Sequence, residues 1–132
     1  MKRVLILALL VAWPVQAQNF TTQAEVQPII EMTRANWVAI GTATGRDLLY
    51  FTHLLSWRCG VEEIRYGLNG AAPETVLQME QCHRDSNQPN AIRDLPFIGY
   101  GLDTIGAVTV LVAFADGTEL VQEFARSEIR ID

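Results

Sequence analysis

Few side chains in this 132-residue sequence have the types and spacing that acid–base or metal chemistry needs. His83 and Asp85 stand two positions apart in a segment rich in Asn, Asp, Ser and Pro, residues 83–96, which is typical of an exposed loop. They could act as a general base and its partner, but two ligands are too few for a metal site. The serines lack the glycine-flanked turn of a hydrolase nucleophile. We therefore predict no metal and no cofactor. A small envelope enzyme that uses His83 and Asp85 is kept as an alternative function.

The two cysteines, Cys59 and Cys82, are predicted to form a disulfide, because a pair of cysteines in a small exported protein rarely stays reduced. The bond would place Arg58 beside His83 and Arg84. It would also close a loop long enough to stabilise a small domain by roughly 3 kcal/mol in the chain-entropy model.

If consecutive strands alternate in direction, the turn near Arg58, the loop after Cys82 and the turn at Asp116 emerge at the same end. We call this end the disulfide rim, and its candidate binding residues are Arg58, His83, Arg84, Asp85 and Asp116. Binding residues favour loops on a rigid scaffold. The sequence thus favours a non-enzymatic binding or accessory module for an unknown protein or small ligand. A structural envelope protein is a further alternative.

The first 17 residues have the pattern of an export signal. Lys2 and Arg3 precede a short apolar run, and residues 15–17 end in an alanine suited to cleavage. The run is shorter than the roughly 20 apolar residues of a transmembrane helix, so we predict no stable membrane insertion after cleavage. We expect a cleaved signal at 1–17, a single globular β domain at 18–132, and a periplasmic or secreted location.

The charge of the chain argues against one class of partner. Ten Lys and Arg residues face 15 Asp and Glu residues, which gives a formal net charge of −5. Removal of Lys2 and Arg3 with the signal makes the charge −7. A surface this acidic repels a phosphate backbone, so we predict that the protein does not bind nucleic acid.

The elements that would position these residues are mostly strands. Residues 47–57 alternate in apolar character and predict the central strand, with His53 and Trp57 on the buried face and Arg58 facing outward. A turn then leads to residues 61–68, which we expect to return beside the central strand as a hairpin. On this interpretation His53 is a hydrogen-bonded core residue and Trp57 packs in the interior.

One short helix is expected near the start of the domain. Thr22 and Glu25 have the spacing of a capping box, but Pro28 would then lie inside the helix. We therefore predict that the helix begins at Pro28 and runs to about Arg34.

The strongest local signal is a hairpin near the end of the chain. Ala115-Asp116-Gly117 separates two apolar strands and suits a three-residue loop with the glycine in the left-handed region. This loop pairs Phe114 with Thr118, Val112 with Leu120, Val110 with Gln122 and Val108 with Phe124. One face of the hairpin is then apolar and the other more polar, as in a sandwich sheet.

The pattern as a whole predicts a mainly β fold, an antiparallel sandwich or partly closed barrel of about seven strands with one short N-terminal helix. The alternative is an α+β fold with the helix packed on a single curved antiparallel sheet. The expected strands are residues 36–43, 47–57, 61–68, 74–81, 97–102, 106–115 and 118–126.

Overall fold

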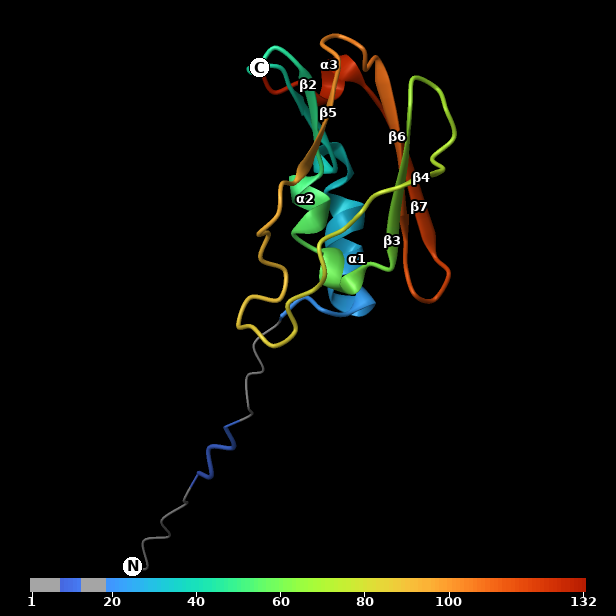
Figure 1. Cartoon of the computed structure of the whole chain (residues 1–132). Helices are drawn as coiled ribbons and strands as arrows, with labels where there is room; N and C mark the ends of the chain where they lie inside the picture. Colours follow the sequence, from blue (N-terminus) through green and yellow to red (C-terminus); the bar gives the residue numbers. More distant parts are fainter. Residues whose placement is uncertain (1–7, 13–18) are drawn as a thin grey trace, which may run out of the picture.

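The computed structural model describes residues 8–12 and 19–132 and confirms a mainly β fold with two antiparallel sheets (Figure 1). The three-stranded sheet has the order β1 (Ala39–Gly41), β2 (Asp47–Tyr50), β5 (Phe97–Tyr100). The four-stranded sheet has the order β4 (Thr75–Val76), β3 (Glu63–Leu68), β6 (Ala107–Ala113), β7 (Glu119–Ala125). The sheets do not join into a closed barrel. Most of the predicted signal, residues 1–7 and 13–17, lies outside the described residues.

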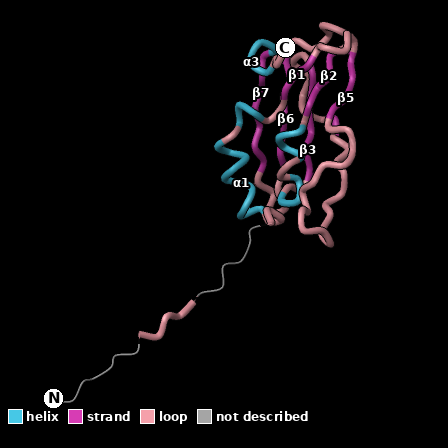
Figure 2. The backbone as a smooth tube through the Cα atoms, turned by 90° about the vertical axis from the view of Figure 1, so that its left-hand side faces the viewer, coloured by secondary structure: helices cyan, strands magenta, loops and turns pink. Residues whose placement is uncertain are grey.

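Short helices connect and flank the sheets: α1 (Gln23–Met32), η1 (Arg34–Asn36), α2 (Thr52–Leu55), η2 (Arg58–Gly60) and α3 (Arg126–Ile129). Figure 2 shows α1 on one side of the strands, next to β7, with β5 on the opposite side. None of the helices in the described part of the chain has the length and apolar character needed to cross a membrane.

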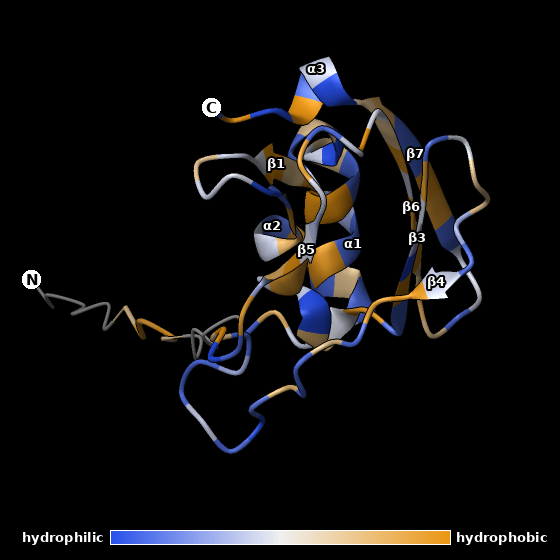
Figure 3. Cartoon of the chain, turned by 45° about the horizontal axis from the view of Figure 1, so that its top comes forward, coloured by the Kyte–Doolittle hydropathy of each residue, from blue (hydrophilic) through white to orange (hydrophobic). Residues whose placement is uncertain are grey.

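The core lies between the two sheets and includes side chains from α1. Val108, Val110 and Val112 of β6 are fully buried, and they share one hydrophobic cluster with Leu49 of β2 and Ile30 of α1. Their alternation along β6 matches the two-residue period of a half-buried strand. Figure 3 shows apolar residues concentrated in these elements, whereas the long loop after the disulfide is largely hydrophilic.

The helix α1 begins at Gln23, so the predicted start at Pro28 is wrong. The Thr22 side chain accepts a hydrogen bond from the N–H of Glu25 at 3.3 Å, and the Glu25 carboxylate accepts one from the N–H of Phe20 at 3.2 Å. The Thr22 cap satisfies a backbone donor that the helix end otherwise leaves unpaired, and Glu25 fixes the chain just before the helix. Pro28 lies inside the helix, where it removes one backbone donor.

The predicted central strand over residues 47–57 is also wrong, because β2 ends at Tyr50 and a helical turn follows. The N–H of Leu55 donates to the carbonyl of Phe51 at 2.9 Å. Phe51, Leu54 and Leu55 are all buried, and their spacing suits one face of a helix as well as parts of a strand. Since β2 and β3 belong to different sheets, the predicted hairpin between them does not form.

The remaining strands differ from the expected ones mainly in length. The first is shortened to β1 by the η1 turn that precedes it, and the fifth ends at Tyr100. The expected strand over 74–81 pairs with β3 only through Thr75 and Val76, followed by one hydrogen bond from the N–H of Leu77 to the carbonyl of Ile64. The segment after Leu77 therefore continues as a loop toward the disulfide.

The hairpin of β6 and β7 is confirmed with its predicted register. Val112 pairs with Leu120, Val110 with Gln122 and Val108 with Phe124, and the N–H of Phe114 donates to the carbonyl of Thr118. Gly117 has a φ of +89°, the left-handed conformation that the three-residue loop requires.

The disulfide between Cys59 and Cys82 is confirmed, with Cα atoms 5.3 Å apart and a sequence separation of 23. We expect the Cys59→Ser, Cys82→Ser double variant to lose about 2 to 5 kcal/mol of unfolding free energy, because the cross-link restricts the unfolded chain. Urea denaturation of the oxidised protein and the variant measures this difference. Wild-type protein reduced with dithiothreitol should match the variant, and thiols that titrate in the natively purified protein would contradict the prediction.

Candidate functional site

The predicted disulfide rim lies at one end of the molecule, where η2, the loop after Cys82 and the turn between β6 and β7 come together (Figure 1). Arg84 is exposed and, with Cys59 and Ala115, lines a shallow cleft of about 200 Å³. The Asp116 carboxylate accepts a hydrogen bond from the N–H of Thr118 at 2.9 Å, which lowers the pKa of Asp116. Asp116 therefore stabilises its own turn.

Arg58 does not belong to the surface of this rim. The prediction that it faces outward is wrong, because its side chain is only 2% exposed. Its guanidinium donates hydrogen bonds to five backbone carbonyls, those of Leu55, Glu80, Gln81, Asn90 and Ala91, at 2.8 to 3.0 Å. Arg58 thus ties η2 to the segment just before Cys82 and to the middle of the long loop.

Trp57 is the half-buried neighbour of Arg58, so its predicted place in the buried interior is wrong. Its ring packs edge-on against Phe20, with centroids 5.1 Å apart, at the border of the core. The indole Nε1 is buried and has no hydrogen-bond partner in the described part of the chain. The helical turn of α2 breaks the alternation that the strand prediction assumed, so Arg58 is buried and Trp57 only half-buried.

His83 contacts Glu80 instead of Asp85. Its ring nitrogen Nε2 pairs with the Glu80 carboxylate, whereas Asp85 is exposed and makes no hydrogen bond or ion pair with His83. Glu80 also accepts hydrogen bonds from the backbone N–H groups of Asp94 and Arg93, both at 2.8 Å. These backbone donors, together with His83, hold the pKa of Glu80 at about 2.

Sequence reasoning missed Glu80, because it was assigned to a strand and its partners lie 13 and 14 positions further along. Within residues 8–12 and 19–132 no group of three or more His, Cys, Asp and Glu side chains is arranged to hold a metal ion. The contacts of Arg58, His83 and Glu80 join parts of the protein to one another, and they hold the loop of residues 83–96 in place.

His53 lies on α2 beside a different pocket. This pocket has a volume of about 400 Å³ and is lined by His53, Trp37, Tyr50 and Ile131 among others. The Thr33 hydroxyl donates to the carbonyl of Ile29 at 2.6 Å, so the His53 Nε2, 2.8 Å away, must donate to Thr33. Burial lowers the pKa of His53, which favours the neutral ring. His53 makes the hydrogen bond expected of it, but its ring is only half-buried, and the residue belongs to α2 instead of a strand.

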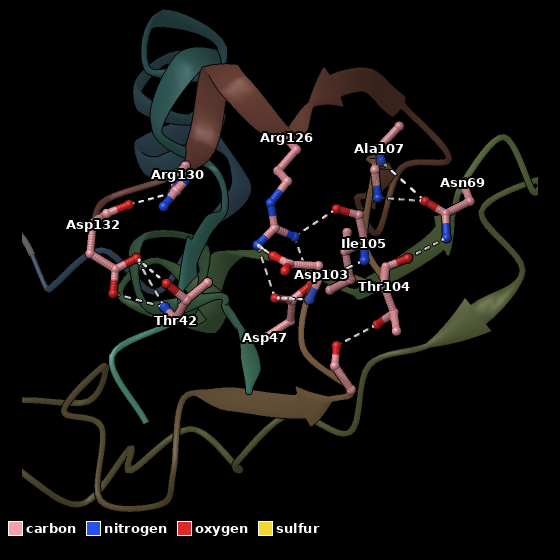
Figure 4. A network of polar contacts seen from close by, with 12 residues as sticks. Thr42, Asp47, Asn69, Asp103, Thr104, Ile105, Ala107, Arg126, Arg130 and Asp132 are labelled. Carbon is pink, nitrogen blue, oxygen red and sulfur yellow. Dashed lines mark hydrogen bonds and ion pairs between the residues drawn. The ribbon is translucent and has the colours of Figure 1, made fainter. Parts of the chain in front are cut away.

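A second network braces the end of the molecule opposite the rim (Figure 4). Asp47 is fully buried, and its carboxylate accepts hydrogen bonds from Arg126 at 2.6 and 2.9 Å. It also accepts the N–H groups of Asp103 and Ile105, both at 3.0 Å. Arg126 and these two donors hold the pKa of Asp47 well below its ordinary range. No spacing in the sequence links Asp47 to Arg126, 79 positions away.

A cleft lies between the two sheets, on the side formed by β4 and β5. Its volume is about 370 Å³, and its walls include Val76, Leu77, Leu95 and Phe97. Two of these side chains are unusually exposed for their type, Leu95 at 77% and Val76 at 47%. Exposed apolar side chains that gather around a concave site mark a binding surface more often than isolated ones do.

Tyr66 of β3 and Tyr100 of β5 join the two sheets beside this cleft. Their hydroxyl groups are 2.7 Å apart and form a hydrogen bond across the interior. Burial, and then the bond to Tyr100, raise the pKa of Tyr66, so Tyr66 stays uncharged at neutral pH. The bond between Tyr66 and Tyr100 therefore holds the two sheets together beside the cleft. Tyr66 brings a neutral hydroxyl group to the cleft wall.

Comparison with known proteins adds no function to this geometry. No protein-family model, curated protein or solved structure matches the chain. Any function must therefore be argued from the clefts and edges of the structure itself.

Proposed function

We propose that the protein is an exported, non-enzymatic binding domain and that its ligand site is the cleft between the sheets. The observation that carries the proposal is the cleft of about 370 Å³, a volume within the range of small-ligand sites. Ligand sites are typically concave and mostly apolar with a few polar groups, and here Gln78 and Tyr66 supply those groups.

The character of the lining favours binding over catalysis. Of the ten residues around the cleft, Tyr66 is the one with a titratable side chain, and its raised pKa makes it a poor acid or base near neutral pH. The disulfide rim offers a smaller cleft. Arg58, Glu80 and Asp116 are engaged in internal contacts there, whereas Arg84 and Asp85 are exposed. The disulfide and the signal-like first 17 residues support export.

The proposal is tested by NMR titration of the isotope-labelled full chain with the apolar dye 1-anilinonaphthalene-8-sulfonate. We expect saturable shifts of the backbone amides of residues 76–78, 95, 97 and 98. Leu95→Glu should weaken binding about tenfold, because it replaces apolar contact area with a charge at an exposed position that the fold does not need.

Met32→Glu is the matched control, since Met32 is 86% exposed and lies on α1, away from the cleft. It should leave the affinity unchanged. Shifts confined to residues 83–85 would place the site at the disulfide rim, and equal affinities of the Leu95→Glu and Met32→Glu variants would refute the cleft.

A further inference from the structure

Among residues 8–12 and 19–132, no hydrogen-bond partner meets the backbone groups on the outer edge of β5, next to the cleft. The N–H of Phe51 donates to the carbonyl of Pro96 at 2.8 Å, so these two residues face each other as a hydrogen-bonded pair. The register of β2 and β5 then determines which residues of β5 bond to β2. In an antiparallel ladder, alternate residues of a strand bond to a given neighbour. Ile98 and Tyr100 therefore bond to β2, while the N–H and C=O groups of Phe97 and Gly99 point toward the free edge.

The other outer edges are covered, guarded or very short. Ile131 donates its N–H to the carbonyl of Ile40 on β1 at 3.0 Å, and the Arg34 side chain donates to the carbonyl of Val121 on β7 at 3.2 Å. Glu119 and Glu123 are exposed residues of β7 itself, and β4 has only two residues. Charged residues, covering segments and short strands are the usual protection of sheet edges. The four residues of β5 include no charge and no proline.

From this edge and the adjoining cleft, we propose that an extended segment of a partner protein adds to β5 as a fourth strand of the three-stranded sheet. This inference rests on the proposed function, because the same cleft receives the side chains. The free groups of Phe97 and Gly99 repeat every second residue, about 6.8 Å apart, a spacing that an extended backbone matches. A peptide backbone presents its own N–H and C=O groups at this same spacing, so one extended segment can pair with both residues.

The added strand would fill the cleft with alternate side chains. Residues directly opposite one another in a sheet point to the same face. Ile98 packs against the core and lines the cleft, so a segment residue opposite Ile98 enters the cleft beside Leu77. The partner segment should therefore carry apolar residues at every second position.

A second copy of this chain is a poorer occupant. Pairing β5 with β5 would oppose the same side chains, and Ile98 and Tyr100 are already engaged in their own core, Tyr100 through its bond to Tyr66. They cannot also enter the cleft of another copy. A segment whose apolar side chains are free can fill it.

The test uses a fluorescently labelled heptapeptide of alternating threonine and valine, with threonine at both ends, titrated into the full chain. In antiparallel pairing with valines toward the cleft, the threonine amides face β5. N-methylation of the threonines should weaken binding at least about tenfold, because it removes the donors to the carbonyls of Phe97 and Gly99. N-methylation of the valines should leave the affinity within about threefold.

If N-methylation of the valines alone weakens binding, strand addition is also supported. The peptide then runs parallel to β5 instead of antiparallel. Strand addition to β5 would be overturned by equal affinities of the two methylated peptides. It would also be overturned if the unmethylated peptide does not bind at millimolar concentration. If the dye still binds the cleft in that case, the proposed function stands and the strand inference fails. A β5-paired dimer, seen by sedimentation and by slowed amide exchange at Phe97 and Gly99, would also overturn it.

Discussion

Replacing Arg58 with methionine is expected to lower the free energy of unfolding by about 3 to 5 kcal/mol. Methionine keeps much of the apolar stem but removes every donor. Five backbone carbonyls that now accept hydrogen bonds from the guanidinium would be left without them in a site where the side chain is 2% exposed. Each buried acceptor that loses its partner costs about 1 to 3 kcal/mol, reduced where water enters the loop.

Urea denaturation followed by circular dichroism measures this effect, and Arg84→Met is the matched control. Arg84 is exposed two positions after Cys82 and forms no ion pair within the described residues, so its replacement should change stability by less than about 0.5 kcal/mol. Trp57→Ala should cost less than Arg58→Met, because Trp57 is half-buried at the border of the core. Equal stabilities of Arg58→Met and wild type would show that the side chain faces solvent, as the strand prediction required.

Replacing Asp47 with asparagine should have a similarly large effect, a loss of about 3 to 5 kcal/mol at neutral pH. Asparagine keeps the shape but removes the charge, which leaves the partly buried Arg126 guanidinium without its main counter-ion. It also replaces one accepting oxygen by a donor that faces other donors. The loop between β5 and β6, which Asp47 holds through Asp103 and Ile105, should loosen first.

Asp103→Asn provides the control for this ion pair. The Asp103 side chain is 78% exposed and lies 3.4 Å from Arg126, and exposed pairs contribute less than about 1 kcal/mol. Thermal and urea unfolding of both variants separate the buried contact from the exposed one. A loss as large for Asp103→Asn as for Asp47→Asn would contradict the assignment.

The same carboxylate should make stability depend on acid pH. Arg126 and backbone donors lower the pKa of Asp47 in the folded state, so its stabilisation is fully present above the ordinary value near 3.8 and is lost as the pH falls below it. Unfolding midpoints measured from about pH 6 to about pH 2 should fall less steeply for Asp47→Asn than for wild type. Glu80 also has a lowered pKa, but it contributes equally to both proteins, so the difference isolates Asp47.

Several features of this protein were determined by residues close together in the sequence. The register of β6 and β7 follows from alternating apolar residues and from Gly117, whose φ is positive. The disulfide follows from the presence of two cysteines. The spacing of Thr22 and Glu25 is also local, and Thr22 does cap α1, although the helix begins before Pro28. A single missing hydrogen bond is offset by the cap and by the burial of Val26 and Ile30.

Other features depended on contacts between distant segments. Phe51, Leu54 and Leu55 fit both a strand and a helical turn, and the core between two sheets selects the turn. Arg58 is buried because carbonyls more than 20 positions away converge on it, and Asp47 meets Arg126 from the other end of the chain. The free edge of β5 exists because, in the described part of the chain, β5 pairs with β2 alone. The order of strands in a sheet is set by long-range packing that local sequence patterns do not encode.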